Sequence, residues 1–561
     1  MRESKVAYWA KFAHMAMSTE ELEASPKGVT GLRAVEVVPP QGRQRTTTVR
    51  YAFPAQELDA RSGESFHVVI DGEAVGFGAE VDLDSRTLSV RQGKGHDDAR
   101  FTQGFFWSHV QARDITEARL ELAEDVLDRG LEAPGRYRAA RDLFEGRVGR
   151  SAGGFDAARR PDEAPLAAAT RLALALDGGV LPVQGPPGAG KTYTAARVIV
   201  ALVSAGQKVA VTALSHKAIG NLLAEVVVAA REVGVEMVVG HKGNDVPDGV
   251  KAYGAYDALE GDLASGRLHV IGGTAWAWSR PSVRRSLDTL VIDEAGQFSL
   301  ATALSVATAA RNLVLLGDPQ QLTQPIQGTH PGGAEVSALE HLLAGERTLA
   351  DGRGLFLAET WRMHPAVNAF VSRSFYEARL EPRPENARLR LRGTDGFDGA
   401  GIAFVPVEHE GRDGTAPEEV AAALEVLGRL TGDGARFVDK HGAERPLTHA
   451  DVLVIAPFNR HVAALARALP GSVRVGTVDK LQGQEAPVVL YALGVSSLDL
   501  APRGVGFLFD LHRCNVAVSR AQARAIVLAS PRLVEEVPAD VEGLRLVNAH
   551  VRLVRPGRPP A

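Results

Sequence analysis

Short apolar runs alternate with longer segments of helical periodicity from about residue 165 to residue 535. Uninterrupted apolar runs are typical of strands buried on both faces, and strands that alternate with helices predict parallel sheets. The runs fall into two series, which we interpret as two α/β domains at residues 165–345 and 346–535. The predicted strands are residues 180–183, 209–212, 269–271, 289–292 and 313–316 in the first domain, and 402–407, 452–455, 473–475, 488–492 and 525–528 in the second.

The N-terminal region has a different pattern, with short strands separated by turn residues. An Asp71-Gly72 pair between two of these strands predicts a hairpin. With a preceding helix whose apolar side chains are expected to pack (Tyr8, Trp9, Phe12, Met15 and Met17), the strands predict a β-barrel-like accessory domain over residues 1–110. Helices at 115–127 and 137–144, followed by a glycine-rich linker at 151–154, predict a stalk and linker over residues 111–164. The tail, residues 536–561, is expected to be frayed. The predicted N-terminal strands are residues 35–38, 47–53, 66–70, 74–81 and 87–90.

The chain of 561 residues has 63 Lys and Arg against 68 Asp and Glu, a formal net charge of −5. This balance excludes a globally basic coat for nucleic acid, so any such binding would use a local groove. The single cysteine, Cys514, excludes a disulfide framework and a cysteine-rich metal site. Because no apolar run has the length of a membrane span and the N-terminus lacks a signal sequence, we expect a cytoplasmic protein with no membrane partner.

A glycine-rich segment between the first predicted strand and a helix has the form of a phosphate-binding loop. It contains Gly185, four further residues, and then Gly190, Lys191 and Thr192. The backbone N–H groups of such a loop hold phosphate oxygens, its lysine reaches the β- and γ-phosphates, and its threonine hydroxyl binds Mg²⁺. Pro182 in the preceding strand is unfavourable, because proline cannot donate to a sheet. The predicted nucleotide-binding residues are Gly185, Pro186, Pro187, Gly188, Ala189, Gly190, Lys191, Thr192 and Tyr193.

Two later strands end in residues suited to the same reaction. Asp293 and Glu294 follow the strand 289–292, and in a phosphate-loop protein the first carboxylate holds Mg²⁺ while the second positions the attacking water. Gln321 follows the strand 313–316 and a tight turn, and an amide that faces the γ-phosphate can report whether that phosphate is present. The sequence therefore predicts a nucleotide hydrolase with Lys191, Asp293, Glu294 and Gln321 as catalytic residues.

The order of these motifs resembles that of superfamily 1 helicases, in the branch with Asp-Glu-Ala-Gly in its second motif. This branch includes the RNA helicase of nonsense-mediated decay and the Okazaki-fragment nuclease-helicase, and the resemblance covers residues 165–535. The helicase portion of bacterial fusions with a RecB-like nuclease looks most similar, although no nuclease is recognisable in this chain. The further matching stretches are residues 212–218 (motif Ia), 273–274, 360–365 (motif IV), 476–485 (motif V) and 515–521 (motif VI).

This resemblance implies two RecA-like motor domains that hold ATP and Mg²⁺ between them. Arg362 and Arg520 look like the two arginines that reach the γ-phosphate from the second domain, and Glu485 looks like a residue that contacts the ribose. Trp361 stands where a tyrosine commonly stacks on adenine, and the alternative is a core tryptophan. Thr170 stands where the family has an adenine-reading glutamine, so the resemblance does not imply strict selectivity for ATP.

The resemblance also implies an ATP-dependent helicase or translocase on single-stranded nucleic acid, with DNA favoured over RNA and 5′-to-3′ polarity. An alternative is a nucleic acid-dependent ATPase clamp or regulatory subunit that serves a repair or defence nuclease in trans and does not unwind duplex. A transporter or assembly ATPase is a third interpretation, but it leaves motifs IV to VI unexplained. The residues implied to contact the strand are Thr212, Ser215, His216, Lys217, Thr274 and Thr477, with a capping or packing role equally open for His216.

Overall fold

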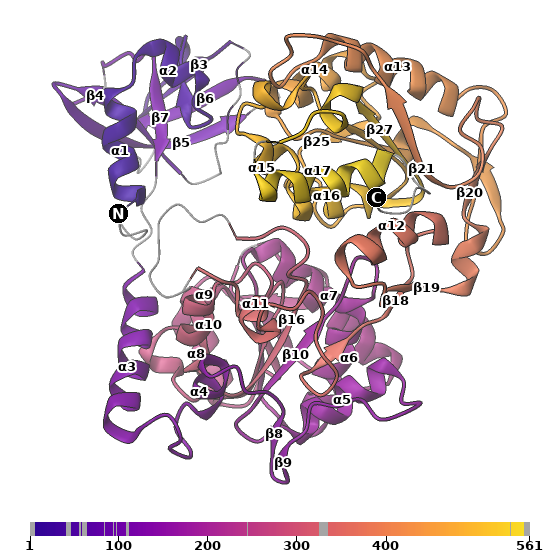
Figure 1. The fold of residues 1–561 in the computed structure, drawn as a ribbon. Coiled ribbons are helices and arrows are strands. Elements are labelled where there is room, and N and C mark those ends of the chain that lie inside the picture. Colours follow the sequence, from indigo (N-terminus) through magenta and orange to yellow (C-terminus); the bar gives the residue numbers. More distant parts are fainter. Residues whose placement is uncertain are drawn as a thin grey trace. The chain divides into compact units, whose positions relative to one another are not determined.

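The computed structural model describes residues 6–40, 46–54, 56, 58, 64–82, 85–93, 95–96, 98–107, 112–243, 245–324, 335–538 and 540–554. They belong to two compact units, one within residues 1–112 and the other beginning at Arg113 (Figure 1). The second unit contains the predicted motor domains, here called the first lobe and the second lobe. Within the described part of the chain, every helix is too short or too polar to cross a membrane.

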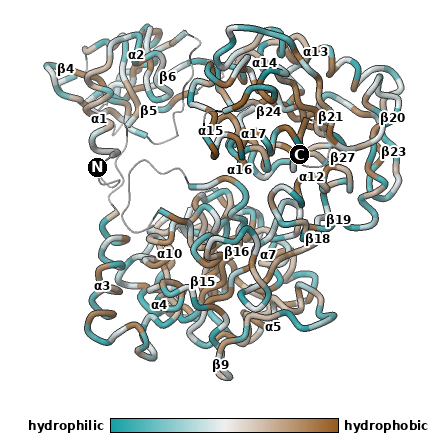
Figure 2. Tube along the Cα trace, in the orientation of Figure 1, coloured by the Kyte–Doolittle hydropathy of each residue, from teal (hydrophilic) through white to brown (hydrophobic). Residues whose placement is uncertain are grey.

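The first lobe is built on an eight-stranded sheet in which all paired strands are parallel. The interior strands β15 and β16 contain apolar runs, Leu290–Ile292 and Leu313–Leu316, as expected for strands covered on both faces. These two strands are among the most hydrophobic segments in Figure 2. The strand order is β13 (Val250–Ala252), β12 (Val239–His241), β14 (Val270–Gly272), β11 (Val209–Thr212), β15 (Leu287–Ile292), β16 (Ala310–Gly317), β10 (Val180–Gln184) and β17 (Leu355–Phe356).

Helices cover both faces of this sheet, and the two faces have separate hydrophobic cores. One core contains apolar side chains of α5 (Pro165–Ala175), α6 (Lys191–Ser204) and α7 (His216–Glu232). The other core takes its helical side chains from α3 (Arg113–Arg129), α4 (Arg138–Phe144), α8 (Tyr256–Ala264), α9 (Ala275–Trp278), α10 (Leu300–Ala307) and α11 (Ala338–Leu343).

Pro182 occupies the middle of β10 without removing a sheet hydrogen bond. The carbonyl of Gln184 accepts from Leu357 N, whereas Gly185 N donates to Gly317 in the opposite direction. Backbone groups alternate sides along a strand, so Pro182 faces the same side as Gln184, away from β16. On that side β17 begins opposite Val183, one residue later. The missing N–H of Pro182 therefore has no acceptor to lose.

The second lobe is built on a parallel five-stranded sheet, so the predicted α/β class with two parallel sheets is confirmed. Its strand order is β21 (Gly401–Pro406), β27 (Ala521–Ala529), β26 (Ala486–Ala492), β24 (Val452–Ile455) and β25 (Arg474–Gly476). Its helices are α12 (Pro365–Phe375), α13 (Pro417–Leu430), α14 (Asn459–Ala468), α15 (Val505–Leu508), α16 (Leu511–Val518) and α17 (Val541–Val554). The short β18 (Glu359–Thr360) joins the lobes and pairs with β19 (Glu381–Pro382), and a side sheet contains β20 (Arg390–Arg392), β22 (Arg436–Val438) and β23 (Glu444–Pro446).

The prediction of a frayed tail is wrong for residues 541–554, which form α17. Leu553 is fully buried in a core of the second lobe, and the ring of His550 lies 4.2 Å from that of Phe509. An apolar stripe on an amphipathic helix gives this segment a packing surface, which overrides its terminal position. The remaining tail residues, 555–561, lie outside the described residues.

The first unit contains an antiparallel sheet of seven strands, where a β-barrel-like domain was predicted. Its order is β1 (Gly28–Val29), β7 (Gly104–Trp107), β4 (Ser65–Ile70), β5 (Glu73–Asp82), β6 (Thr87–Gln92), β3 (Thr47–Ala52) and β2 (Arg33–Val38). Among the described residues the end strands β1 and β2 do not pair, so the sheet is not closed. The helices α1 (Val6–Ala16) and α2 (Thr19–Ala24) precede it. Trp9 and Phe12 of α1 are 49% and 42% exposed, whereas His14 of the same helix stacks on Phe105 of β7 with the ring centroids 5.3 Å apart. The helix therefore packs on the sheet through His14, which was not among the predicted packing residues.

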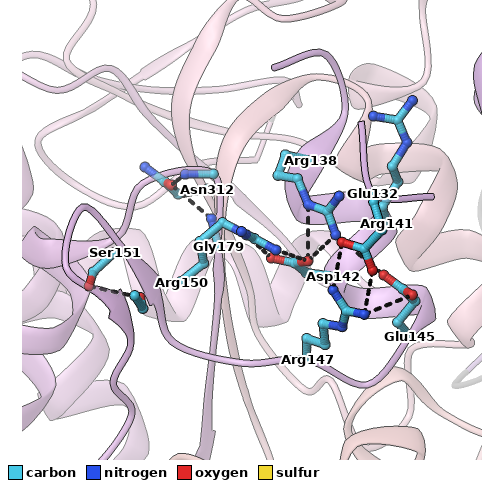
Figure 3. Close-up of polar contacts among 12 residues, drawn as sticks. Glu132, Arg138, Arg141, Asp142, Glu145, Arg147, Arg150, Ser151, Gly179 and Asn312 are labelled. Carbon is cyan, nitrogen blue, oxygen red and sulfur yellow. Dashed lines mark hydrogen bonds and ion pairs between the residues drawn. The ribbon is translucent and has the colours of Figure 1, made fainter. Parts of the chain in front are cut away.

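The predicted linker at 151–154 forms the turn of a hairpin, β8 (Arg150–Ser151) and β9 (Gly154–Phe155). Arg150 at its base donates to Asp142, whose fully buried carboxylate also accepts from Arg138 (Figure 3). On the sheet side, Asn312 Oδ1 accepts from the N–H of Gly179 at 3.3 Å. The ion pairs of Asp142 fix the hairpin to α4, because breaking one partner of a buried ion pair is costly. The hairpin is attached to the sheet by backbone bonds, from Gly149 N to the Val180 carbonyl at 2.8 Å and from Asp177 N to the Arg150 carbonyl at 3.0 Å.

Candidate nucleotide site and nucleic acid face

The predicted phosphate loop leaves β10 and enters α6 at Lys191. Gly188 and Gly190 adopt φ angles of +72° and +76°, which glycine reaches without strain. Gly190 caps α6 without a side-chain bond, so the first N–H groups of the helix are available to an anion. Lys191 Nζ donates to the Gly185 carbonyl at 2.5 Å, and Thr192 is exposed at the start of the helix.

Asp293 and Glu294 lie at the carboxyl end of β15, beside this loop. Asp293 is 7% exposed. The pKa of its carboxyl is raised to about 7, mainly by burial and secondly by the charge of Glu294. The positive charge of Lys191 tends to lower the pKa of Asp293, so the ammonium group lies close enough to act on this carboxyl. Glu294 adopts a φ of +54°, an uncommon conformation for a non-glycine residue. Strained backbone at a carboxylate pair is typical of a functional site.

Thr192 and Asp293 carry the oxygen atoms predicted to bind a divalent cation. Both offer oxygen ligands, which Mg²⁺ prefers, and a cation would offset the cost of ionising a buried carboxylate. Within the described residues no group of three or more His, Cys, Asp or Glu could hold a metal ion by itself. A cation here would therefore take its other ligands from phosphate and water, as Mg²⁺ usually does at nucleotide sites.

The second lobe contacts the phosphate loop through the segment after β18. Thr360 Oγ1 donates to the Pro187 carbonyl at 2.9 Å, and Trp361 N donates to the Gly188 carbonyl at 2.9 Å. A Cβ atom on Gly188 would lie only 2.6 Å from Cβ of Arg362. Glycine at 188 is therefore needed twice, for its backbone angle and for the close approach of the arginine.

Arg362 and Arg520, predicted from distant motifs, lie together. Arg362 pairs with Glu485 and donates to the Ser519 carbonyl at 3.0 Å, next to Arg520. Arg520 is 3% exposed, and among the described residues its Nε and Nη2 have no hydrogen-bond partner. The pKa of the Arg520 guanidinium is lowered to about 9, mainly by burial and secondly by the charge of Arg362, while the charge of Glu294 tends to raise it. Buried guanidinium donors without partners suit an anionic ligand.

The residues predicted around the base and ribose are accessible. Trp361 is 47% exposed, so it is not a core tryptophan, and the Arg383 guanidinium lies 4.3 Å from its ring centroid. Tyr193 is 50% exposed and stacks against Arg197. Burial tends to raise the pKa of Glu485, but the charge of Arg362 and a bond from Gln522 hold it below its ordinary value. Glu485 thus contacts an arginine of the site as well as facing solvent.

Gln321, the predicted phosphate sensor, belongs to a buried hydrogen-bond network. Its Nε2 donates to Asp318 Oδ2 at 2.8 Å, and the same oxygen accepts from the Tyr376 hydroxyl at 2.6 Å. Asn515 Nδ2 donates to that hydroxyl at 2.8 Å. The sequence analysis assigned no role to Asp318, Tyr376 or Asn515. Asp318 and Asn515 stand inside recognised motifs, which was a usable signal, whereas nothing local distinguishes Tyr376.

The residues predicted to contact nucleic acid divide into exposed and buried ones. Lys217 is exposed, and Ser215 caps α7 with its hydroxyl. Thr274 occupies the N-cap position of α9, where its side chain makes no capping bond. Thr212 is fully buried in β11, so a direct contact with a strand is wrong for this residue, and Thr477 is 8% exposed.

His216 has a specific partner that the sequence did not indicate. Its Nδ1 lies 3.0 Å from His241 Nε2, and burial lowers the pKa of both rings, that of His241 to about 4. A neutral histidine pair does not attract phosphate by charge. Lys242, which follows His241, bonds through its N–H to Gly272 at the end of β14, and Trp276 beyond that end is 40% exposed. An ammonium and an exposed indole at one sheet edge are suited to a phosphate and a base.

Comparison with known proteins finds similarity in both lobes. Residues 167–334 and 334–532 each match a family model described as an AAA domain. The DNA polymerase alpha-associated DNA helicase A of Schizosaccharomyces pombe is 25% identical over 63% of this chain and 61% of its own length. The DNA replication ATP-dependent helicase/nuclease DNA2 of Mus musculus is 26% identical over 64% of this chain and 36% of its own length. The chain thus spans less than two thirds of these relatives.

A third relative, the ATP-dependent helicase upf1 of Schizosaccharomyces pombe, is 26% identical over 63% of this chain and 43% of its own length. Among solved structures, the complex of Arterivirus nonstructural protein 10 (helicase) with DNA matches 87% of this chain and 80% of that chain. Its identity of 14% and TM-score of 0.40 are too low to support an inference. The two matched models thus describe AAA domains over residues 167–334 and 334–532, and each of the three relatives is named as a helicase.

Proposed function

We propose that the chain is a helicase that uses ATP and Mg²⁺ to move along single-stranded nucleic acid and to separate duplex. The observation that carries this proposal is the contact of the second lobe with the phosphate loop at Pro187 and Gly188. A triphosphate on this loop would then meet Arg362 and Arg520, so its γ-phosphate would favour closure of the lobes. Its hydrolysis would remove that partner and permit opening.

Each residue of the pocket has a role that its surroundings support. Lys191 would exchange the Gly185 carbonyl for a phosphate oxygen, and Thr192 and Asp293 would hold Mg²⁺. Glu294 would position the attacking water, while Arg520 would donate its unpaired N–H groups to the transferring phosphoryl group. Trp361 would stack on the base, and Glu485 would accept from the ribose.

The strand would cross the carboxyl ends of β11, β12 and β14. Lys217 and Lys242 would contact phosphates, Ser215 and Thr274 would donate hydroxyl hydrogens, and Trp276 would stack on a base. Backbone contacts of this kind give little sequence preference and an affinity that falls with salt. Thr477 would contact the strand from the second lobe after a local rearrangement, because its side chain is buried.

We further propose DNA as the preferred strand, 5′-to-3′ movement, and membership of the branch of nonsense-mediated decay and Okazaki-fragment helicases. DNA is supported by relatives named as a DNA helicase and as DNA replication helicase/nucleases. An RNA helicase of Mus musculus, Mov10l1, is also similar, at 29% identity over 44% of this chain, so RNA is the necessary comparison. A nuclease partner in trans would supply the activity that the helicase/nuclease relatives carry in one chain.

Matched single strands and forked duplexes of DNA and RNA test this proposal. We expect single-stranded DNA to stimulate ATP hydrolysis more than single-stranded RNA does. We also expect fluorescent duplexes with only a 5′ overhang to be unwound faster than duplexes with only a 3′ overhang. Lys191→Ala should abolish both activities. Stimulated hydrolysis without strand displacement would favour the clamp instead. Hydrolysis that neither strand stimulates would contradict the proposal.

A further inference from the structure

Tyr376 inserts between the two lobes at the predicted phosphate sensor. It is the C-cap residue of α12 in the second lobe and is fully buried. Its hydroxyl donates to Asp318 Oδ2 of the first lobe at 2.6 Å and accepts from Asn515 Nδ2 at 2.8 Å. Asp318 is 2% exposed and Asn515 is fully buried, so water does not replace these bonds.

The two partners of Tyr376 lead to both sides of the candidate active site. Asp318 Oδ2 also accepts from Gln321, whose amide is the predicted sensor of the γ-phosphate. Asn515 also donates to the Gln320 carbonyl at 2.8 Å, and it lies on α16, which ends one residue before Ser519 and Arg520. A single hydroxyl therefore connects the predicted sensor amide with the helix that precedes the second arginine.

The direction of these bonds is fixed by chemistry. An ionised Asp318 carboxylate has no hydrogen to donate, and the Asn515 amide nitrogen can only donate. The Tyr376 hydroxyl must therefore donate to Asp318 and accept from Asn515. Burial raises the pKa of Tyr376 well above its ordinary value, and the nearby Asp318 carboxylate raises it further. The hydroxyl therefore keeps its proton at any physiological pH. The network has one arrangement, which it can lose only by breaking a buried bond.

We propose that Tyr376 is a positioning residue for hydrolysis, which holds Asp318 so that Gln321 and the α16 helix respond to the γ-phosphate together. When the Gln321 amide turns toward the γ-phosphate, Asp318 loses one donor and keeps the hydroxyl of Tyr376. That remaining bond holds the carboxylate in place and keeps α16, with Arg520 at its end, against the first lobe. This inference rests on the proposed ATP hydrolysis and adds a contact that neither the motifs nor the relatives assign.

Tyr376→Phe tests the inference, because it removes the hydroxyl and keeps the ring. The matched control is Tyr491→Phe, since Tyr491 of β26 is also buried and, among the described residues, its hydroxyl has no partner. We expect Tyr376→Phe to lower kcat about tenfold or more, the effect of losing a hydrogen bond to a charged group, with Kd for a fluorescent ATP analogue within about twofold of wild type. Tyr491→Phe should keep the kcat of the wild type.

A double-mutant cycle with Asp318→Asn separates positioning from general stability. If the two residues act through one bond, the kcat of the double variant should be close to that of the more impaired single variant. A Tyr376→Phe enzyme with wild-type kcat, or one whose loss matches that of Tyr491→Phe, would overturn the inference. If single strands fail to stimulate the wild type, the proposed helicase function fails, and basal kcat of the same variants still decides the role of Tyr376.

Discussion

Asp293 and Arg520 are charged residues that the fold keeps almost completely out of water. Neither has an oppositely charged partner close enough to neutralise it within the described structure, and both have strongly shifted pKa values, raised for Asp293 and lowered for Arg520, chiefly because they are buried. Uncompensated buried charge is destabilising in a structural position. At the proposed nucleotide site the same residues would become partners of a cation and of a phosphate, which would explain why the fold tolerates them.

Glu294→Gln tests the predicted water-positioning carboxylate at this scale. The amide keeps the size of the side chain but cannot accept a proton, so we expect turnover to fall by about 10²-fold or more while nucleotide binding is retained. Steady-state ATP hydrolysis and titration with a fluorescent ATP analogue measure the two quantities. Turnover close to that of the wild type would assign the water to another residue.

At the scale of elements, each lobe gains its stability from helices that cover a parallel sheet, and α17 extends this cover at the end of the described chain. Leu546, Val547 and Leu553 of α17 are buried in the core that also contains α12 and α16. Leu544 on the opposite face is 46% exposed. The helix is therefore attached to the second lobe by one apolar stripe.

Leu553→Ala should lower the free energy of unfolding by about 2–5 kcal/mol, because it leaves a cavity in this core. Leu544→Ala on the same helix should change it by no more than about 0.5 kcal/mol. Urea unfolding followed by circular dichroism measures both variants. Equal effects of the two substitutions would mean that α17 does not pack through the stripe seen here.

The sequence was sufficient for elements whose pattern is local. Each of the predicted sheet strands in the two lobes overlaps an observed strand, because a continuous apolar run favours a strand buried on both faces. The overlap is two residues for the predicted strands 269–271 and 473–475. Short strands such as β12 and β17 were not predicted, because two or three residues are too few to show the pattern of apolar side chains that marks a strand. The linker at 151–154 was misread because glycine serves equally in a linker and in a tight hairpin turn.

Contacts between distant residues were beyond the sequence. The motifs named Gln321 and the segment around Asn515, but the bond from Tyr376 to Asp318 joins positions 58 residues apart whose orientation depends on the packing of both lobes. His216 and His241 meet because β14 pairs both with β11, which leads into α7 and His216, and with β12, which carries His241. The burial of Thr212 and the exposure of Trp361 likewise follow from tertiary structure, so their residue types alone did not determine them.

At the scale of the whole molecule, we propose that the two lobes together form one nucleotide pocket. The first lobe provides the phosphate loop and the carboxylates, and the second provides Arg362 and Arg520. The lobes meet at Gly188 and again at Tyr376, on two sides of the same site. A pocket completed by two lobes links nucleotide state to lobe position, which is what a motor requires.

The turnover of Arg520→Ala in saturating ATP and single-stranded DNA tests this claim most directly. We predict a loss of about 10³-fold in kcat, the lower range for an arginine that stabilises a transferring phosphoryl group, with little change in nucleotide affinity. Arg524→Ala is the matched control, because Arg524 is partly buried on β27, which begins one residue after Arg520, and donates to the Ala400 carbonyl instead. A kcat of Arg520→Ala within a few fold of the control would contradict a pocket completed by the second lobe.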